Sequence, residues 1–208
     1  MKIIIISSSE RSDIEPGIVT QLFENGLDIF HLRKPKLSTG ELSTYIKEIP
    51  KGFHNRIVIH SHHKLARKYN LMGVHITKGH RKNKLRTWIN LKLNRMKNPQ
   101  LVVSTSFRNI ANLFEDDFNY SYVFLSPVFD SLTHKFQSGF TPHSLRSALS
   151  KTKHKVIARG GIDIHSLEKV TELGFEGMAL YSSIWKSKEP VKQFLAIRER
   201  CTELGITA

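Results

Sequence analysis

Short apolar runs recur along the chain, and an amphipathic stretch follows most of them. The runs are apolar throughout rather than alternating, which is typical of parallel strands buried on both faces. They predict strands at residues 2–7, 27–32, 56–60, 73–76, 101–104, 122–125, 155–158 and 177–180. The intervening stretches have apolar residues at helical spacing and predict helices at residues 13–26, 38–49, 62–69, 109–118, 142–149, 166–173 and 190–204.

Local signals support several of these helices. Glu41 follows Ser38 by three residues, which predicts a capping box at the start of one helix. Gly174 marks the end of another. In the helix at 109–118 we expect Leu113 and Phe114 to face inward.

Strict alternation of strand and helix needs a parallel sheet. Eight units in 208 residues predict an α/β fold, a (β/α)8 TIM barrel that forms a single domain over residues 1–208. A doubly wound open sheet is the alternative, but no GxGxxG follows the first strand. In a barrel, functional residues lie at the carboxyl ends of the strands, and phosphate often binds after strands seven and eight.

The last two predicted strands end in small and hydroxyl residues. The segment KVIARGGI, at 155–162, contains Gly160 and Gly161, which allow close backbone approach and positive φ. GMALYSSIW, at 177–185, brings Ser182 and Ser183. Exposed backbone N–H groups at neighbouring strand ends bind anions. We therefore predict a site for a phosphorylated small molecule, although a glycine pair after a strand also occurs as a simple turn.

The other strand ends are rich in cations, hydroxyls and imidazoles, which suits an anionic ligand. These residues are Ser7, Ser8, Ser9, His31, Arg33, Lys34, Lys36, His60, Ser61, His62, His63, His75, Thr77, Lys78, Ser104, Thr105, Ser106, Arg108, Ser126, Ser131, Thr133, His134, Lys135 and Arg159. Carboxylates are nearly missing there, apart from Asp130. The HSHH segment at 60–63 looks like a metal-binding cluster. Alternating side chains point in different directions, however, and no Asp, Glu or Cys is near, so we expect no metal site.

The charge is strongly basic, with 32 Lys and Arg against 18 Asp and Glu and a net charge of +14. Such a balance is compatible with nucleic acid, an anionic surface or phosphorylated ligands. The densest part, residues 78–97, has no nucleic-acid-binding motif, and Trp88, Leu91 and Leu93 indicate a helix there. We therefore interpret this part as a solvated helical face, and nucleic acid is not the expected partner.

Targeting signals are lacking in the sequence. No apolar run approaches the length of a membrane span, and the apolar residues 1–6 have no cleavage pattern after them. Cys201 has no second cysteine with which to pair, which favours a reducing compartment and a structural role. We expect a cytoplasmic protein without a membrane partner, and the sequence is compatible with a homo-oligomer.

Taken together, these segments resemble the thiamine-phosphate synthases and the related thiazole tautomerases over nearly the whole chain. The segments that carry the resemblance are GLDIFHLRKP, NLMGVHI, VSTSF, YVFLSPVFDSLTHK, ARGGI and GMALYSSIW. The synthases join a hydroxymethylpyrimidine diphosphate to a thiazole phosphate and release diphosphate. The diphosphate departs, and the thiazole nitrogen captures the pyrimidine cation that remains.

The resemblance implies roles for individual residues. Arg33 and Ser106 would be catalytic, with a diphosphate or pyrimidine role. The implied substrate-binding residues are His31, Lys34, His60, Thr133, Lys135, Gly160, Gly161, Ser182 and Ser183, of which the last four would hold the thiazole phosphate. Mg²⁺ is the cofactor that the family uses to hold diphosphate.

Several positions depart from the pattern of the synthases. His31 stands where they have glutamine, and Pro35 stands where they have a second cation, for which Lys34 or Lys36 would substitute. His60 and Ser61 replace an Asn-Asp pair.

The second Mg²⁺-binding acid would fall near His80, where the sequence has no carboxylate. Mg²⁺ prefers carboxylate oxygens, so the residues present predict no Mg²⁺ site and leave the cofactor open.

Three functions follow from these observations. The first is an enzyme, a transferase with synthase activity in which cations take over the work of Mg²⁺. The second is a tautomerase or another isomerase, with His31, His60 or His134 as the acid–base group. The tautomerases have their catalytic histidine at the end of the sixth strand, where this chain has Pro127. The third is a phosphometabolite-binding barrel without catalysis.

Overall fold

The structure is a computed structural model of the 208-residue chain. It describes residues 1–130, 135–136 and 140–206. The chain divides into two compact units, one made of residues 1–5 and 105–208 and the other of residues 6–104.

Eight strands form a closed barrel in which the neighbours follow the order of the sequence. The strands are β1 (Lys2–Ile6), β2 (Ile29–Leu32), β3 (Ile57–Ile59), β4 (Gly73–Ile76), β5 (Val102–Phe107), β6 (Tyr122–Leu125), β7 (Val156–Arg159) and β8 (Gly177–Leu180).

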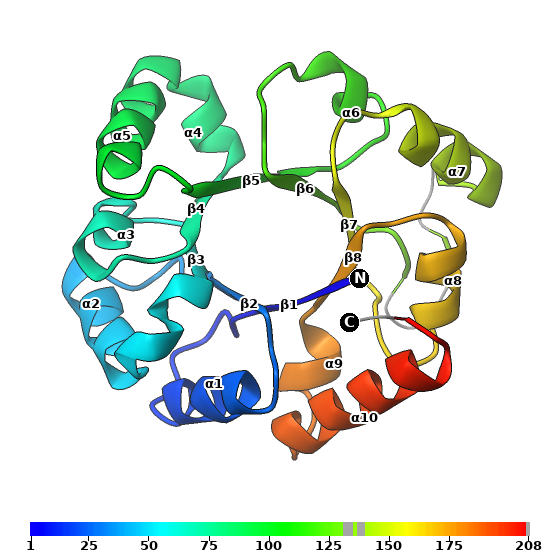
Figure 1. Cartoon of the computed structure of the whole chain (residues 1–208), viewed down its shortest axis with the longest axis horizontal. Coiled ribbons are helices and arrows are strands. Elements are labelled where there is room, and N and C mark those ends of the chain that lie inside the picture. Colours follow the sequence, from blue (N-terminus) through cyan, green and yellow to red (C-terminus); the bar gives the residue numbers. More distant parts are fainter. Residues whose placement is uncertain (131–134, 137–139, 207–208) are drawn as a thin grey trace. The chain divides into compact units, whose positions relative to one another are not determined.

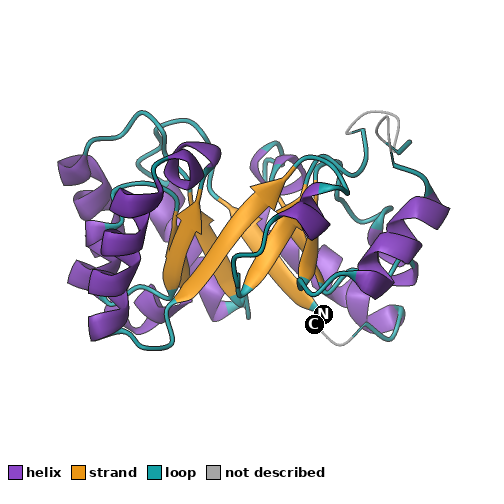
Figure 2. Cartoon of the chain, turned by 90° about the horizontal axis from the view of Figure 1, so that it is seen from above, coloured by secondary structure: helices purple, strands orange, loops and turns teal. Residues whose placement is uncertain are grey.

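Helices connect successive strands (Figure 1). They are α1 (Glu15–Glu24), α2 (Thr39–Glu48), the short 3-10 helix η1 (Lys51–Arg56), α3 (Lys64–Tyr69), α4 (Lys78–Lys82), α5 (Lys84–Lys97), α6 (Asn112–Glu115), α7 (Pro142–Lys151), α8 (Leu167–Glu172), α9 (Ser182–Trp185) and α10 (Pro190–Glu203). In Figure 2 the strands are orange and the helices that connect them are purple.

Strand pairing within each unit is parallel. In residues 6–104, β2 pairs with β3 and β3 with β4. In the other unit β6 pairs with β7, β7 with β8, and β8 with β1. These parallel ladders and the closed order confirm the predicted (β/α)8 barrel, and the single-domain assignment stays a prediction.

The core explains why these segments become strands. Every residue of β2, β3, β4, β6 and β8 is buried, as expected for parallel strands covered on both faces. The capping box predicted at α2 is present, because Ser38 Oγ accepts from the Glu41 N–H and the Glu41 carboxylate accepts from the Ser38 N–H.

No helix in the described ranges has the length and apolar character needed to cross a bilayer.

Two elements between residues 101 and 118 differ from the prediction. The strand predicted to end at residue 104 continues to Phe107, because the side chains of Thr105 and Phe107 are buried despite the polar residues around them. The helix predicted over 109–118 is reduced to α6 (Asn112–Glu115), in which Leu113 is buried. Phe114 was expected to face inward, and this was wrong because 51% of it is exposed.

The segment at residues 78–97, where the sequence indicated one helix, forms the two helices α4 and α5. Asn83 separates them, and its side chain accepts from the Arg86 N–H at the start of α5. Of the three apolar residues that suggested a helix, only Leu91 is buried, whereas Trp88 and Leu93 are exposed. The helix thus forms as expected but packs through a narrower face than its apolar residues suggested.

Candidate active site

The loop after β7 has the backbone shape that its glycines predict. Gly160 and Gly161 have φ values of +92° and +66°, a region that other residues adopt at a cost. A Cβ on Gly160 would lie 2.7 Å from the Pro127 Cβ, and one on Gly161 would lie 2.7 Å from the carbonyl oxygen of Phe129. The close backbone approach that these glycines allow therefore serves packing against residues 127–129.

The second half of this candidate phosphate site follows β8. Because Arg159 pairs with Ala179, the glycines that follow β7 run beside residues 180 and 181. Ser182 and Ser183 come next and open the short helix α9. The Ser183 Oγ is buried and has no hydrogen-bond partner among the described residues. A buried hydroxyl without a partner is costly, so it marks a place where a ligand with acceptor oxygens would fit.

Arg33 lies directly after β2 and is half-buried. Its main chain is fixed, since the Arg33 N–H donates to Ser7 Oγ at 2.8 Å and Ser7 Oγ donates to the Arg33 carbonyl at 3.0 Å. The guanidinium Nη1 donates to Ser9 Oγ at 3.5 Å. The loops after β1 and β2 are thus joined, and they hold Arg33 at the carboxyl end of the strands.

Lys34 is buried rather than solvated. Its Nζ donates to Glu15 Oε2 at 2.5 Å and to the Glu10 carbonyl at 2.5 Å, and it lies over the ring of Tyr45. The Tyr45 hydroxyl donates to the other oxygen of the Glu15 carboxylate at 2.9 Å. The substrate-binding role expected for Lys34 stays a prediction, and this ion pair argues against it because the ammonium already has an anionic partner.

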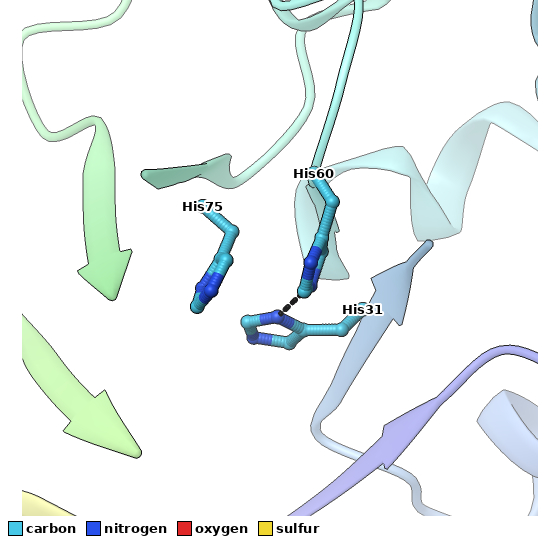
Figure 3. A group of neighbouring side chains, drawn as sticks. All are labelled: His31, His60 and His75. Carbon is cyan, nitrogen blue, oxygen red and sulfur yellow. Dashed lines mark hydrogen bonds between the residues drawn. The ribbon is translucent and has the colours of Figure 1, made fainter. Parts of the chain in front are cut away.

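Three imidazoles from consecutive strands meet inside the unit formed by residues 6–104. They belong to His31 of β2, His60 directly after β3 and His75 of β4, and all three are at least 95% buried. Figure 3 shows the three rings facing one another, with a hydrogen bond of 2.9 Å between His31 Nδ1 and His60 Nε2. The rings of His60 and His75 are stacked, with centroids 4.1 Å apart.

A cavity of about 490 Å³ lies at the strand ends of the same unit. Its lining includes His62, His63, Lys64, His80 and Arg86, so it is dominated by groups that carry or can acquire positive charge. The rings of His63 and His80 are 4.5 Å apart. Burial, followed by the neighbouring His80, lowers the pKa of His63 to about 4. His63 is therefore neutral at pH 7, while Lys64 and Arg86 supply the charge.

The remaining predicted site residues lie in the unit made of residues 1–5 and 105–208. Ser106 is half-buried and sits within β5 rather than after it. Lys135 is exposed, and its carbonyl accepts from the Asp130 N–H at 2.9 Å. Thr133 and His134 lie outside the described residues.

The positions expected to hold Mg²⁺ have no carboxylate. His60 and Ser61 follow β3, and His80 lies in α4, as the sequence indicated. Among the described residues, the group of side chains that could hold a metal consists of His31, His60 and His75. Imidazole nitrogens suit transition metals, whereas Mg²⁺ takes oxygen ligands, so these residues do not fit Mg²⁺.

Sequence reasoning named His31, His60 and His75 separately at strand ends but did not group them. The signal was available, because each histidine lies at the end of a consecutive strand, where neighbouring strands bring inward side chains together. Sequence reasoning also missed Ser7 as the partner of Arg33 and Glu15 as the partner of Lys34. Neither has a local sequence signal, because the partners are 26 and 19 residues apart.

Solved structures similar to this chain share its fold along nearly its whole length. Thiamine phosphate pyrophosphorylase from Bacteroides thetaiotaomicron is 28% identical, with a TM-score of 0.77 over 97% of this chain and 98% of that one. The same enzyme from Pyrococcus furiosus is 17% identical, with a TM-score of 0.76 over 98% and 96%. The (S)-3-O-geranylgeranylglyceryl phosphate synthase from Thermoplasma acidophilum is 12% identical, with a TM-score of 0.70 over 97% and 93%, which shows the fold alone.

A search of the curated proteins found no match. The family model for thiamine monophosphate synthase, in contrast, matches residues 3–184, which include every strand from β2 to β8 and both halves of the candidate phosphate site. The chain therefore belongs to the thiamine monophosphate synthase family.

Proposed function

We propose that this protein is a thiamine-phosphate synthase that couples hydroxymethylpyrimidine diphosphate to a thiazole phosphate and releases diphosphate. The observation that carries the proposal is the buried Ser183 hydroxyl, which has no hydrogen-bond partner among the described residues. It follows β8, the strand that pairs with β7 and its terminal glycine pair, in a chain of this family. The backbone N–H groups of Gly160 and Gly161 and the Ser183 Oγ would donate to the phosphate of the thiazole.

The diphosphate needs positive charge as it leaves, because negative charge grows on it when the carbon–oxygen bond breaks. The lining of the 490 Å³ cavity offers Lys64 and Arg86 for this purpose. Arg33 does not line this cavity, but it follows β2 in the same unit and is a third candidate. Lys64 and Arg86 are exposed, whereas the main chain of Arg33 is fixed by Ser7. Arg33 is therefore the best candidate, because a preorganised cation stabilises a developing charge without the cost of reorganising water. Cationic side chains would thus do what Mg²⁺ does in the synthases.

The test is to mix the purified protein with both substrates and to follow thiamine phosphate by chromatography, with Mg²⁺ and with a chelator. We expect product in both conditions. A matched pair of variants sharpens the result. Arg33→Met should lower kcat by at least about 100-fold if the guanidinium stabilises the leaving group, whereas Lys47→Met, at an exposed position in the last turn of α2, should leave kcat unchanged.

Absence of thiamine phosphate in both conditions would refute the synthase proposal. Two further readouts then identify which alternative applies. Isomerisation of a thiazole phosphate alone would indicate a tautomerase. A rise in melting temperature with thiazole phosphate, but no turnover of it, would indicate a binding barrel.

A further inference from the structure

The proposed reaction assigns no step to the cluster of His31, His60 and His75, and the substrate-binding roles expected for His31 and His60 stay predictions. Inward positions of such barrels are usually filled by Val, Ile or Leu. Here three consecutive strands instead supply three imidazoles, each at least 95% buried. We infer that these histidines form a binding site for a divalent transition metal of the Zn²⁺ class. The inference stands on this cluster alone and does not depend on the proposed function.

The spacing of the donor atoms fits this reading. One nitrogen from each of the three rings lies within 4.8 Å of the other two. Tetrahedral Zn²⁺ with Zn–N distances of about 2.0–2.1 Å puts two ligand nitrogens about 3.3 Å apart. The His31 Nδ1 and His60 Nε2 are 2.9 Å apart and need to separate only slightly. The stacked rings of His60 and His75 need to tilt so that both nitrogens face a common point.

A second interaction orients the third ligand. His75 Nδ1 lies 2.9 Å from Ser104 Oγ, and Ser104 is fully buried. With Nδ1 engaged by the hydroxyl, Nε2 is the nitrogen that His75 offers to a metal. Histidine ligands in metal sites usually have such a partner on their other nitrogen, which fixes the tautomer and the ring orientation.

The proton balance also permits binding. In the hydrogen bond between His31 and His60, one facing nitrogen carries a proton and the other accepts it. When a metal binds between them, the donor ring adopts its other tautomer, with the proton on its second nitrogen. No net charge is lost from the protein, and three neutral imidazoles hold the ion.

The ligand set selects the class of metal. Imidazole suits Zn²⁺, Cu²⁺, Fe²⁺ and Ni²⁺, whereas Mg²⁺ and Ca²⁺ require oxygen ligands. Three histidines leave a fourth position of the tetrahedron for water or an anion, as in catalytic rather than structural zinc sites. The inference therefore departs from the expectation of no metal site that the sequence alone suggested.

The experiment uses the untagged full chain, stripped of metal with a chelator and dialysed. Co²⁺ is titrated into it while the visible absorption is recorded, and Zn²⁺ is then added to displace Co²⁺. We expect the intense absorption of four-coordinate Co²⁺, saturation at one ion per chain, and its loss on addition of Zn²⁺. Mg²⁺ in large excess should not compete.

Variants locate the ion. Each of His31→Gln, His60→Gln and His75→Gln should weaken binding by at least about 100-fold, and Ser104→Ala by about 10–100-fold with the stoichiometry kept. His143→Gln, at an exposed position, is the control that should bind like the wild type. The double variant His63→Gln/His80→Gln tests the neighbouring pair of imidazoles. His63 hydrogen-bonds to the main chain of His60 and His75, so this variant should weaken binding less than the variants at 31, 60 and 75 do.

Three outcomes would overturn the inference. One is the absence of stoichiometric Co²⁺ or Zn²⁺ binding to the wild type. Another is loss of binding in the His63→Gln/His80→Gln variant while the variants at 31, 60 and 75 still bind. If the variants fail to fold, X-ray absorption at the zinc edge of the loaded wild type decides instead: three imidazoles support the site, and fewer than three refute it.

Discussion

Lys34 and Glu15 form an ion pair with an Nζ–Oε2 distance of 2.5 Å, and both side chains are almost completely buried. The pair joins the loop after β2 to α1. Burial raises the pKa of the Glu15 carboxyl, and the Lys34 ammonium and the Tyr45 hydroxyl offset part of this effect. Each of the two charges is thus tolerated in the interior because the other is present.

Removing one partner should therefore be more damaging than removing both. We expect Lys34→Met to lower the free energy of unfolding by about 3–5 kcal/mol, because Glu15 would be left as a buried charge without its partner. The double variant Lys34→Met/Glu15→Gln should recover much of this loss, since a neutral amide can still accept from Tyr45. Urea unfolding of both single variants and the double variant measures the coupling.

Lys36→Met is the matched control, because Lys36 is exposed and should change stability by less than about 0.5 kcal/mol. Additive effects of the Lys34 and Glu15 changes would contradict the coupling. A folded double variant that has lost affinity for the pyrimidine diphosphate would instead restore the substrate-binding role expected for Lys34.

The glycines after β7 give a second prediction. Gly160→Ala and Gly161→Ala should each destabilise the fold by more than the roughly 1–2 kcal/mol that a left-handed backbone costs. The excess arises because the new Cβ would lie 2.7 Å from the nearest atom of Pro127 or Phe129. Gly174→Ala is the control: its φ of +90° is similar, but nothing lies within 4 Å of its Cβ. Thermal unfolding in the absence of ligand measures all three.

Equal losses at the three glycines would show that backbone strain alone explains their choice. Larger losses at Gly160 and Gly161 would mean that the segment at 127–129 requires them. Phosphate affinity of any folded variant then reports separately on the ligand-binding role.

The barrel could be predicted from the sequence because its signal is local. Continuous apolar runs such as those at 122–125 and 177–180 coincide with β6 and β8, since a strand buried on both faces leaves no polar position to blur its ends. Prediction failed where polar residues are buried, as at Thr105, which extends β5 beyond the expected end. It also failed where an apolar side chain stays exposed, as at Phe114.

The site was predictable only residue by residue. The glycine and serine pairs were found because they follow strands directly in the sequence. The histidine cluster and the Lys34–Glu15 pair arise from side chains on different elements, and their contacts depend on strand register and helix packing. A single sequence contains the residues of such clusters, but it does not state which of them meet.

Ser183 provides a third prediction. Ser183→Ala should raise the KM for thiazole phosphate by about 10–100-fold, because it removes a hydrogen bond to a charged group worth about 1.5–3 kcal/mol. It should leave the stability of the ligand-free protein unchanged or slightly higher, because the buried hydroxyl bonds to none of the residues that the structure describes. Steady-state kinetics and thermal unfolding test the two halves of this prediction.

Ser150→Ala, at an exposed position in α7, is the control and should alter neither quantity. If Ser183→Ala loses stability without ligand, its hydroxyl has a structural partner. An unchanged KM would remove Ser183 from the phosphate site.

His63 makes stability depend on pH in mildly acidic solution. Its pKa is lowered from 6.5 to about 4, first by burial and then by the charge of His80, with a smaller effect of His62. Between these pH values the unfolded chain binds a proton that the folded chain does not, so acidification favours unfolding. We expect this residue to contribute a fall of about 3 kcal/mol in the free energy of unfolding as the pH drops from 6.5 to 4.

The measurement is urea unfolding across this pH range, in the presence of a chelator so that no metal contributes. His63→Gln should flatten the pH dependence, whereas His62→Gln, at an exposed position, should keep it close to that of the wild type. The prediction is wrong if His63→Gln and the wild type lose stability in parallel as the pH falls, because another group would then bind the proton that drives unfolding.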